Sequence, residues 1–518
     1  MMDTAPTRRQ LLTAGVGAGI VGLAGCAETS LDAEADGTFT IVPTADPTGT
    51  GDSWDNWGGM TPYWTRVIEP LVWGTDGMQP QPWLATDWTA TDDTTWVFDL
   101  REGVTFHNGD EMTADDVVHS FEEDILTERG DFVHGWLHVE PGSVDRIDDY
   151  TVSFETTEPF PGFPGTIAHN MIDIQPAEAD RRAGEIIGTG PFTLAEMEQG
   201  QQLRVERFED YWGGAPEPTE LTFRAAEDAT TRTDLLVAGE VDLIYEPATS
   251  RIDGLRERGD VRIETEQSSG SVFVSINIHR EPTDDADLRR ALNYAISQDE
   301  IVTTVLEGVG QPASGPLSTV IDWAADEELP AYERDRDRAR DLVSQSSYDG
   351  EELTCLVEND MDDGRTLVQI LQEEYEKIGV TLDVEVLESA SLRDRTDRGE
   401  FHLELGTSQS NSPAADYIMW ENFHTMGISN KDLYEAEGTG LHNLGGEVDE
   451  LIETGFQSHD PDEKREAYVA AQREIMDAGV VIPLFYREYV VAADAELEGL
   501  DLHPIDKFAQ WGELTRTT

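Results

Sequence analysis

Lysine is almost absent from this sequence, and basic residues of either kind are scarce. The 518 residues include four lysines, 35 lysines and arginines together, and 106 aspartates and glutamates, which gives a net charge of −71. Nucleic acids and anionic membrane surfaces attract basic patches, so we exclude both as default partners. A GC-rich genome could exchange lysine for arginine, but it would not create the acidic excess. We therefore expect adaptation to very high salt, where a Debye length of ~3 Å at 1 M removes most surface self-repulsion.

Cysteine is also rare, since Cys26 and Cys355 are the only two. A chain processed at Cys26 can hold no internal disulfide. Cys355, inside the apolar run LTCLV, is expected to be a small buried hydrophobic residue.

Motifs of the common hydrolases and nucleotide-binding enzymes are missing, because no Walker A loop, HExxH or GxSxG pattern occurs. Catalysis would have to rest on carboxylate pairs, and most of the 106 acids are expected on the solvated surface. A secreted hydrolase therefore stays only as an alternative. The sequence predicts no catalytic residue, no cofactor and no metal site.

The first 26 residues have the pattern of a targeting segment. TRRQLL at residues 7–12 is a twin-arginine pattern, and the apolar run from Leu11 to Ala24 is too short for a comfortable membrane span. LAGC at residues 23–26 resembles a lipobox, which predicts that Cys26 is lipidated and becomes the mature N-terminus; a lone buried cysteine is the alternative. Residues 27–37, small and acidic, are expected to form a flexible tether.

The stretch at residues 188–245 carries the most specific pattern of the sequence. GTGP at residues 188–191 predicts a tight turn before an alternating strand, and YWGG at residues 211–214 places two aromatic side chains beside another turn. DATTR at residues 228–232 opens a short helix, and AGEVD at residues 238–242 leads into an apolar run. A dinucleotide-binding loop is not predicted, because GTG lacks the third glycine of that motif.

In this order, GTGP, a long hairpin, YWGG, DATTR and AGEVD resemble the dipeptide, oligopeptide and nickel solute-binding proteins of ABC importers, known as family 5. The resemblance extends to WVFDLREGVTFHNG at residues 96–109 and RRALNYAI at residues 289–296. It implies an α/β fold, namely the two-lobed type II periplasmic-binding-protein fold with an extra α+β domain on lobe one and a two-strand hinge. With the acidic composition and the lipobox, it indicates a lipoprotein of the haloarchaeal type.

The same resemblance gives domain boundaries. Lobe one is expected at residues 38–73, 186–268 and 491–518, the extra domain at residues 74–185, and lobe two at residues 269–490. In the extra domain, Trp96, Phe98 and Leu100 alternate with polar neighbours and predict a strand, and Thr113 is placed to cap a helix. In lobe two, a 3.6-residue period at residues 288–296 predicts a helix, and residues 353–386 predict a β-α-β unit.

The ligand-binding residues that the resemblance implies are Trp57, Trp136, His169, Asp416 and His424. Trp136 matches a tryptophan that lines the ligand cavity of nickel-type members, and His169 falls where those members have an arginine that grips the carboxylates of a metal chelator. Asp416 matches the aspartate that holds the free amino group of peptide ligands, for which a carboxylate is a good partner; a helix cap is the alternative. His424 lies near the metal-touching histidine of the nickel subgroup, and an ordinary polar loop histidine is the alternative.

His134 and His138 are four residues apart and invite a metal interpretation. Gly135 argues against a firm helix between them, and no third ligand is evident, so a solvated loop is expected.

The function implied by the resemblance is that of the extracytoplasmic solute-binding subunit of an ABC importer, not an enzyme. Two lobes would close on a short peptide and deliver it to the membrane permease, whose separate ATPase subunits supply the energy. Nickel or another metal, bound as a small-molecule chelate, is the alternative ligand. We expect a monomer, held by its lipid at the outer face of the cytoplasmic membrane.

Overall fold

The computed structural model describes residues 37–48, 64–127, 133, 136–179, 186–359, 361, 363–427 and 444–517. Cys26 with the targeting segment, the tether up to residue 36, Trp57 and His134 lie outside the described residues. Among the described helices, none is both long and apolar enough to span a bilayer.

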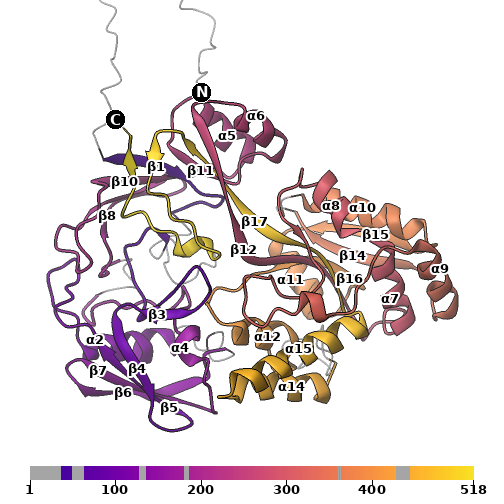
Figure 1. Ribbon diagram of the computed structural model, residues 1–518, viewed down its shortest axis with the longest axis horizontal. Helices are drawn as coiled ribbons and strands as arrows, with labels where there is room; N and C mark the ends of the chain where they lie inside the picture. The colour runs from indigo at the N-terminus through magenta and orange to yellow at the C-terminus, as the bar shows by residue number, and fades with distance from the viewer. Residues whose placement is uncertain are drawn as a thin grey trace, which may run out of the picture. The chain divides into compact units, whose positions relative to one another are not determined.

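A sheet of 11 strands runs through both lobes (Figure 1). Its order is β15-β14-β16-β12-β17-β11-β1-β10-β9-β8, and the short β13 pairs with β17 outside this path. In chain order the strands are β1 (Thr38–Val42), β8 (Phe192–Glu198), β9 (Gln202–Arg207), β10 (Glu220–Arg224), β11 (Leu243–Tyr245), β12 (Val261–Ile276), β13 (Gln311–Pro312), β14 (Glu352–Glu358), β15 (Thr381–Leu387), β16 (Leu403–Ser408) and β17 (Val481–Asp494).

The two long strands β12 and β17 connect the lobes. They pair antiparallel from Val261 opposite Asp494 to Ser275 opposite Val481, with register shifts after Gln267 and after Val272. Figure 1 shows them crossing from the half that holds β1 and β11 to the half that holds β14 and β16. Because β17 also pairs with β11 and β12 also pairs with β16, the crossing strands belong to the sheets of both lobes. The predicted two-lobed α/β fold with a two-strand hinge is confirmed.

A second, antiparallel sheet forms the extra domain in the order β4-β5-β7-β6. Its strands are β4 (Ala85–Ala90), β5 (Thr95–Leu100), β6 (Val139–Asp148) and β7 (Thr151–Thr156), and a separate hairpin of β2 (Val72–Gly74) and β3 (Pro80–Pro82) precedes them. Trp96, Phe98 and Leu100 are buried, as their alternation predicts. Helix α2 (Ala114–His119) begins at Thr113, which forms a capping box with Asp116, and continues into the π-helical turn η1 (Ser120–Ile125).

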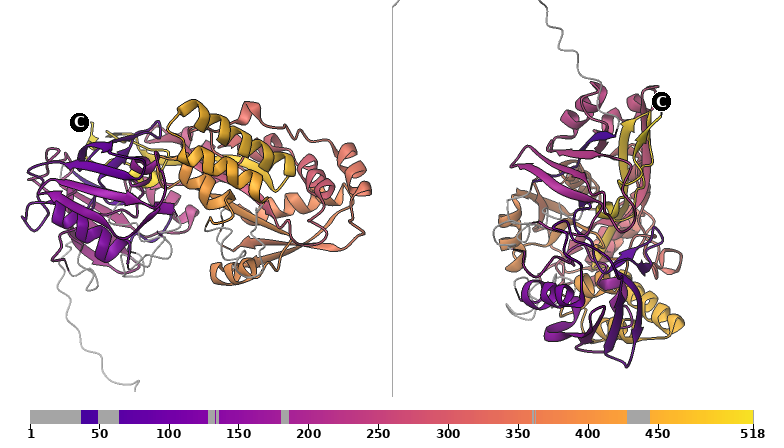
Figure 2. Two further views of the ribbon diagram at one scale, coloured as in Figure 1. Left: turned by 90° about the horizontal axis from the view of Figure 1, so that it is seen from below. Right: turned by 90° about the vertical axis from the view of Figure 1, so that its left-hand side faces the viewer.

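Helices cover the sheet of lobe two, as Figure 2 shows. The helices that the sequence predicts are α7 (Ala286–Ala295), α8 (Gln298–Thr304), α10 (Gly364–Glu376) and α15 (Pro461–Ala478). Gly479 ends α15 in the left-handed conformation, with φ of 65°, which glycine adopts without steric cost. Four further helices have no counterpart in the sequence-based prediction: α9 (Arg336–Gln345), α11 (Ser389–Asp397), α12 (Ala415–Phe423) and α14 (Gly446–Gln457).

The carboxylate of Glu69 explains why the GTGP and YWGG motifs occur together. It is fully buried and accepts hydrogen bonds from Thr189 Oγ1 at 2.8 Å, from Tyr211 Oη at 2.8 Å and from the indole nitrogens of Trp212 at 3.0 Å and Trp83 at 2.7 Å. A buried charge without donors would be very costly, so four donors make this position tenable. Glu69 therefore joins segments that lie more than 100 residues apart in the chain.

The two glycines of GTGP are required by close backbone contact. A Cβ at Gly188 would lie 1.9 Å from the carbonyl oxygen of Val67, and one at Gly190 would lie 2.0 Å from that of Arg66. The sequence-based interpretation, a tight turn, therefore gives only part of the reason for these glycines. Arg66 itself is buried, with its guanidinium 3.9 Å from Glu69 and 3.9 Å from the ring centre of Trp73.

A single hydrophobic cluster joins the extra domain to helices of lobe two. It includes Phe98 and Phe163 from the extra domain and Tyr417 and Phe456 from lobe two. Phe160 stacks on Phe456 with ring centres 4.0 Å apart. Figure 2 shows the purple sheet of the extra domain beside the orange and yellow helices α12, α14 and α15.

Candidate functional site

A cavity of about 810 Å³ lies between residues of the two lobes and against the crossing strands. Lobe one contributes the segment after β11, from Glu246 to Ile252, and β17 contributes residues 485–490. Lobe two contributes Glu358 at the end of β14 and residues 404–407 of β16. In open α/β sheets, ligands bind outside the carboxyl ends of the parallel strands. β11 and β14 are such strands, because each has a parallel neighbour, so the cavity occupies the expected place.

The rim of the cavity on lobe one is shaped by Arg232, the arginine of DATTR. Its buried guanidinium donates hydrogen bonds to the carbonyl oxygens of Tyr245 and Glu246 at 2.9 Å each. It also donates to the carbonyls of Ala226 at 3.0 Å and Glu227 at 2.6 Å. These four bonds hold the turn after β11, where Glu246 adopts a positive φ of 46°. The motif therefore fixes the backbone at the cavity entrance on this side.

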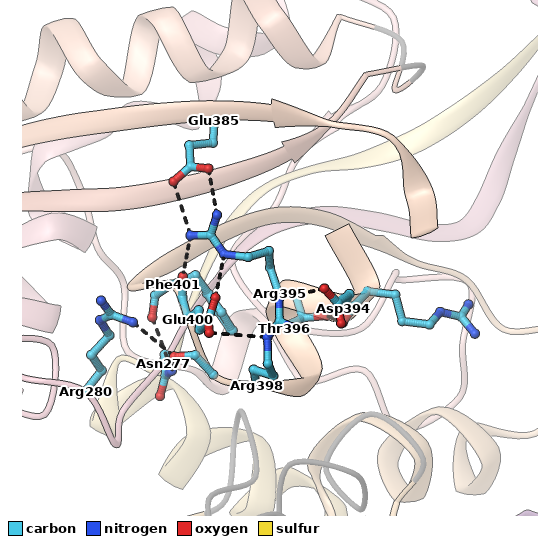
Figure 3. Close-up of polar contacts among 11 residues, drawn as sticks. Asn277, Arg280, Glu385, Asp394, Arg395, Thr396, Arg398, Glu400 and Phe401 are labelled. Atoms are coloured by element: carbon cyan, nitrogen blue, oxygen red, sulfur yellow. Dashed lines mark hydrogen bonds and ion pairs between the residues drawn. The ribbon is translucent and has the colours of Figure 1, made fainter. Parts of the chain in front are cut away.

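The wall on lobe two includes Leu392 from α11, and a charged network fixes this helix (Figure 3). Arg395 donates to both carboxylate oxygens of Glu385, at 2.8 and 3.2 Å, and forms an ion pair with Glu400 at 3.2 Å. Arg398 pairs with Asp394 at 2.6 Å and with Glu400 at 3.2 Å. The helix is thereby tied to β15 and to the loop before β16.

The same loop is held from β12. The amide of Asn277, just after β12, donates to the carbonyl oxygens of Gly399 and Phe401 at 3.2 Å each. Arg280 donates to the Gly399 carbonyl at 3.2 Å, as Figure 3 also shows. The wall formed by α11 and β16 is therefore braced by side chains that themselves do not line the cavity.

Glu404 is the titratable residue of β16 at the cavity. Its neighbours Leu403 and Leu405 are buried in the core of lobe two, whereas the Glu404 side chain is partly exposed and reaches the cavity. Burial by the surrounding protein and the negative charge of Glu358 raise the pKa of Glu404 from 4.5 to about 7. Desolvation disfavours the ionised form of a carboxylate, and a nearby like charge does the same.

Two of the residues predicted from the sequence, Trp136 and His169, lie in contact. Their rings stack with centres 4.3 Å apart, and Tyr417 of α12 packs against both, at 5.6 and 5.2 Å. All three side chains are buried, and none of them lines the cavity of 810 Å³. The structure thus brings Trp136 and His169 together, at the junction of the extra domain with α12.

Asp416 is buried and forms an ion pair within the chain. Its carboxylate oxygens lie 2.6 and 2.8 Å from Lys464 Nζ, and it accepts a hydrogen bond from Tyr468 Oη. It stands in the first turn of α12 and not at the cap position, which Ala414 occupies. An ammonium group already sits where the resemblance places the amino group of a ligand.

His424 follows α12 and is buried in lobe two. It stacks on Trp420 with ring centres 3.8 Å apart, and its Nε2 lies 3.3 Å from Glu453. His138 is also buried, and its Nδ1 lies 3.1 Å from Glu158. The expected solvated loop at His138 is therefore wrong, because aromatic rings of Phe160, Trp420 and Phe456 surround the imidazole.

Metal-binding clusters are not found in the part of the chain that the structure describes, where no three His, Cys, Asp or Glu side chains are grouped to hold an ion. Cys355 is buried, as predicted, and burial raises the pKa of its thiol to about 12.

The sequence analysis missed the acids that line the cavity, Glu246, Glu358 and Glu404. Composition could not distinguish them among 106 acids, and they form no spaced motif. The available signal was position, because Glu246 follows a predicted apolar strand and Glu358 ends one.

Residues 79–430 match the family of bacterial extracellular solute-binding proteins, family 5 Middle. The chain belongs to this family. As a family 5 protein, it is the extracytoplasmic solute-binding subunit of an ABC importer and not an enzyme. The interlobe cavity is therefore the candidate solute site.

Three similar proteins illustrate the range of the family 5 relatives. The chain is 25% identical over 479 residues to the "Probable D,D-dipeptide-binding periplasmic protein DdpA" of Escherichia coli, which covers 89% of this chain and 90% of that protein. The periplasmic binding protein DppA from Helicobacter pylori, solved in complex with the peptide STSA, gives a TM-score of 0.79 at 20% identity, covering 93% and 98% of the two chains. NikA from Staphylococcus aureus, solved with Ni(L-His)2, gives 0.78 at 17% identity, covering 93% and 100%.

Proposed function

We propose that this family 5 protein captures a short peptide between its lobes and delivers it to an ABC permease, whose separate ATPase subunits supply the energy. The observation that carries the proposal is the interlobe cavity of about 810 Å³ at the carboxyl ends of β11 and β14. This volume falls in the range of ~300–1,000 Å³ typical of small-ligand pockets. The similarity to a dipeptide-binding relative and to a peptide-bound structure supports the same ligand class.

Closure of the lobes is the proposed mechanism of capture. The lobes correspond to residues 38–73, 186–268 and 491–518 for lobe one and 269–490 for lobe two, with residues 74–185 as the extra domain. A ligand that contacts both lobes binds the closed form better and so shifts the population toward it. The register shifts in β12 after Gln267 and Val272 lie between the two lobes and support a pivot at that place.

The residues predicted from the resemblance, Trp57, Trp136, His169, Asp416 and His424, are proposed as further ligand contacts. For Asp416, the ligand amino group would replace Lys464 as the partner of the carboxylate. Such an exchange conserves the number of charges at the site, whereas removal of either partner leaves a buried charge alone.

A nickel or other metal chelate is the second candidate ligand. It is supported by the similarity to the Ni(L-His)2-bound structure and by the stacked pair of Trp136 and His169. In this case the metal arrives as part of the cargo, and the chain supplies aromatic surfaces and an imidazole.

Calorimetry in molar salt tests the proposal, with a library of di- to pentapeptides against Ni(II) alone and Ni(II) with small chelators. We expect heat of binding from peptides. Asp416→Asn and Lys464→Met both break the buried ion pair, but only Asp416→Asn should lose peptide binding. Binding of chelates alone, removed by His169→Ala or His424→Ala, would replace the peptide by the metal chelate as ligand.

We further propose that the twin-arginine segment exports the protein already folded and that a lipid on Cys26 holds it, as a monomer, at the outer face of the cytoplasmic membrane. The surface is proposed to be adapted to molar salt. The net charge of −71 supports this, because unscreened self-repulsion of that size destabilises a compact state.

A further inference from the structure

The charge of the cavity lining is strongly unbalanced. Arg487 is the only basic side chain among the described residues that line it. The acidic side chains in the lining are Glu246, Glu307, Glu358, Asp363, Glu404 and Glu488. The whole protein is acidic, however, so this imbalance by itself does not distinguish a ligand site from a salt-adapted surface.

Glu404 differs from a surface acid in its position. It lies in the middle of the sheet, because β16 is paired on one side with β12, where Ser275 faces Glu404, and on the other with β14, where Leu356 faces it. Its side chain can therefore reach solvent only through the cavity. A surface acid, by contrast, keeps its hydration shell and needs no protein partner.

No described residue donates a hydrogen bond to the Glu404 carboxylate or forms an ion pair with it. Arg487, the basic side chain of the lining, forms no ion pair with Glu404. The charged group that acts on Glu404 is another acid, Glu358, whose own carboxylate accepts a hydrogen bond from Ser389. A carboxylate that has lost most of its water and faces a like charge is costly unless a cation compensates it.

We propose that the cavity takes a solute with a fixed positive charge, an ammonium or a guanidinium group, and that Glu404 is the counter-charge, with Glu358 beside it. The inference rests on the proposed solute site and narrows its ligand class. For a peptide, it means a lysine or arginine side chain, or the free amino end, directed at β16. The cation replaces the water that the carboxylate lost and removes the repulsion between the two acids.

Matched tripeptides test the inference, by calorimetry on the mature chain in 2 M KCl at pH 8. The probes are Ala-Lys-Ala, Ala-Ala-Ala and Ala-Glu-Ala, each with a blocked amino end, together with the diamine putrescine and the triamine spermidine. A charged hydrogen bond inside the cavity corresponds to roughly 10- to 100-fold in affinity. We expect Ala-Lys-Ala to bind tighter than Ala-Ala-Ala by that factor, and Ala-Glu-Ala to bind weakest.

Glu404→Gln removes the charge and keeps the shape, and it should abolish the preference for Ala-Lys-Ala. Glu352→Gln, an exposed acid at the start of β14 and outside the cavity, is the matched control and should keep the preference. Circular dichroism confirms that both variants are folded.

The outcomes separate this inference from the proposed function. If the three tripeptides bind equally, or if Glu404→Gln keeps the preference, peptide binding stands and the inference is wrong. If no tripeptide binds but putrescine or spermidine binds in a manner that depends on Glu404, the inference stands and the peptide proposal is wrong. If neither the tripeptides nor the amines bind, the inference is wrong.

Discussion

Replacement of Glu69 by Gln should destabilise the fold strongly, although the two side chains have nearly the same shape. The carboxylate receives four hydrogen bonds between 2.7 and 3.0 Å, from Trp83, Thr189, Tyr211 and Trp212. An amide can accept through its oxygen alone, so its nitrogen would face donors that then lack an acceptor. Each buried donor left in this state costs about 1–3 kcal/mol.

The variant also removes the charge beside Arg66, whose guanidinium is buried 3.9 Å away. Loss of one partner of a buried pair costs ~3–5 kcal/mol, and the two effects overlap because they share one side chain. We expect a total of about 4–6 kcal/mol. The entropy of unfolding of ~2.1 cal/mol/K per residue gives roughly 1 kcal/mol per degree for a chain of this length, so the melting temperature should fall by only about 4–6 °C.

Thermal and urea unfolding in 2 M KCl, followed by near-ultraviolet circular dichroism of the tryptophans, measures the effect. Glu257→Gln, an exposed acid on the surface of lobe one, is the control and should change stability by less than ~0.5 kcal/mol. If Glu69→Gln is as stable as this control, Glu69 does not hold the motifs together in the way described here.

The remaining predictions concern pH, salt and targeting. The pKa of Glu404 near 7 in the free protein means that the residue is protonated at pH 5 and ionised at pH 8, and a cationic solute that binds the ionised form should return the pKa toward 4.5. The affinity for Ala-Lys-Ala should then rise by up to ~70-fold between pH 5 and pH 8; a flat profile in calorimetry contradicts the counter-charge. The melting temperature should rise from dilute buffer to molar salt, because screening relieves the net charge of −71, and an unchanged melting temperature speaks against salt adaptation. Cys26→Ala should release mature protein into the medium, and Arg8→Lys with Arg9→Lys should retain the precursor inside the cell; fractionation and immunoblotting distinguish these outcomes.

The features of the fold that were predictable are those written in local patterns. Alternation marked Trp96, Phe98 and Leu100, and the residues at helix ends, such as Thr113 and Gly479, marked where helices begin or end. The fold class and the family followed from motifs in a fixed order, although the physical reason for the motifs did not. That reason lies in Glu69 and in the backbone of Arg66 and Val67, which reach the motifs only through the tertiary structure.

The candidate site was less predictable, because its residues gain their properties from distant partners. Asp416 carries no sequence signal for Lys464, which lies 48 residues later and forms its ion pair. His138 looked like a loop residue because the rings that bury it come from α12 and α14 of the other lobe. Glu404 gains its raised pKa from a strand about 46 residues earlier in the chain and from the enclosing cavity wall. Patterns along the chain do not report such contacts.

The sharing of β12 and β17 between the lobes also bears on how such a protein can be divided or inherited. Residues 37–518 form one compact unit, and each lobe completes its sheet with the same two strands. A gene fragment that encodes lobe two alone would have to cut both strands near their register shifts and would leave two open sheet edges, which promote aggregation. The lobes should therefore unfold in one cooperative transition, and recombination that exchanges whole lobes between relatives must exchange parts of both crossing strands at once. An insertion into the exposed loops of the extra domain meets no such constraint, which makes that domain the part of the molecule free to diverge.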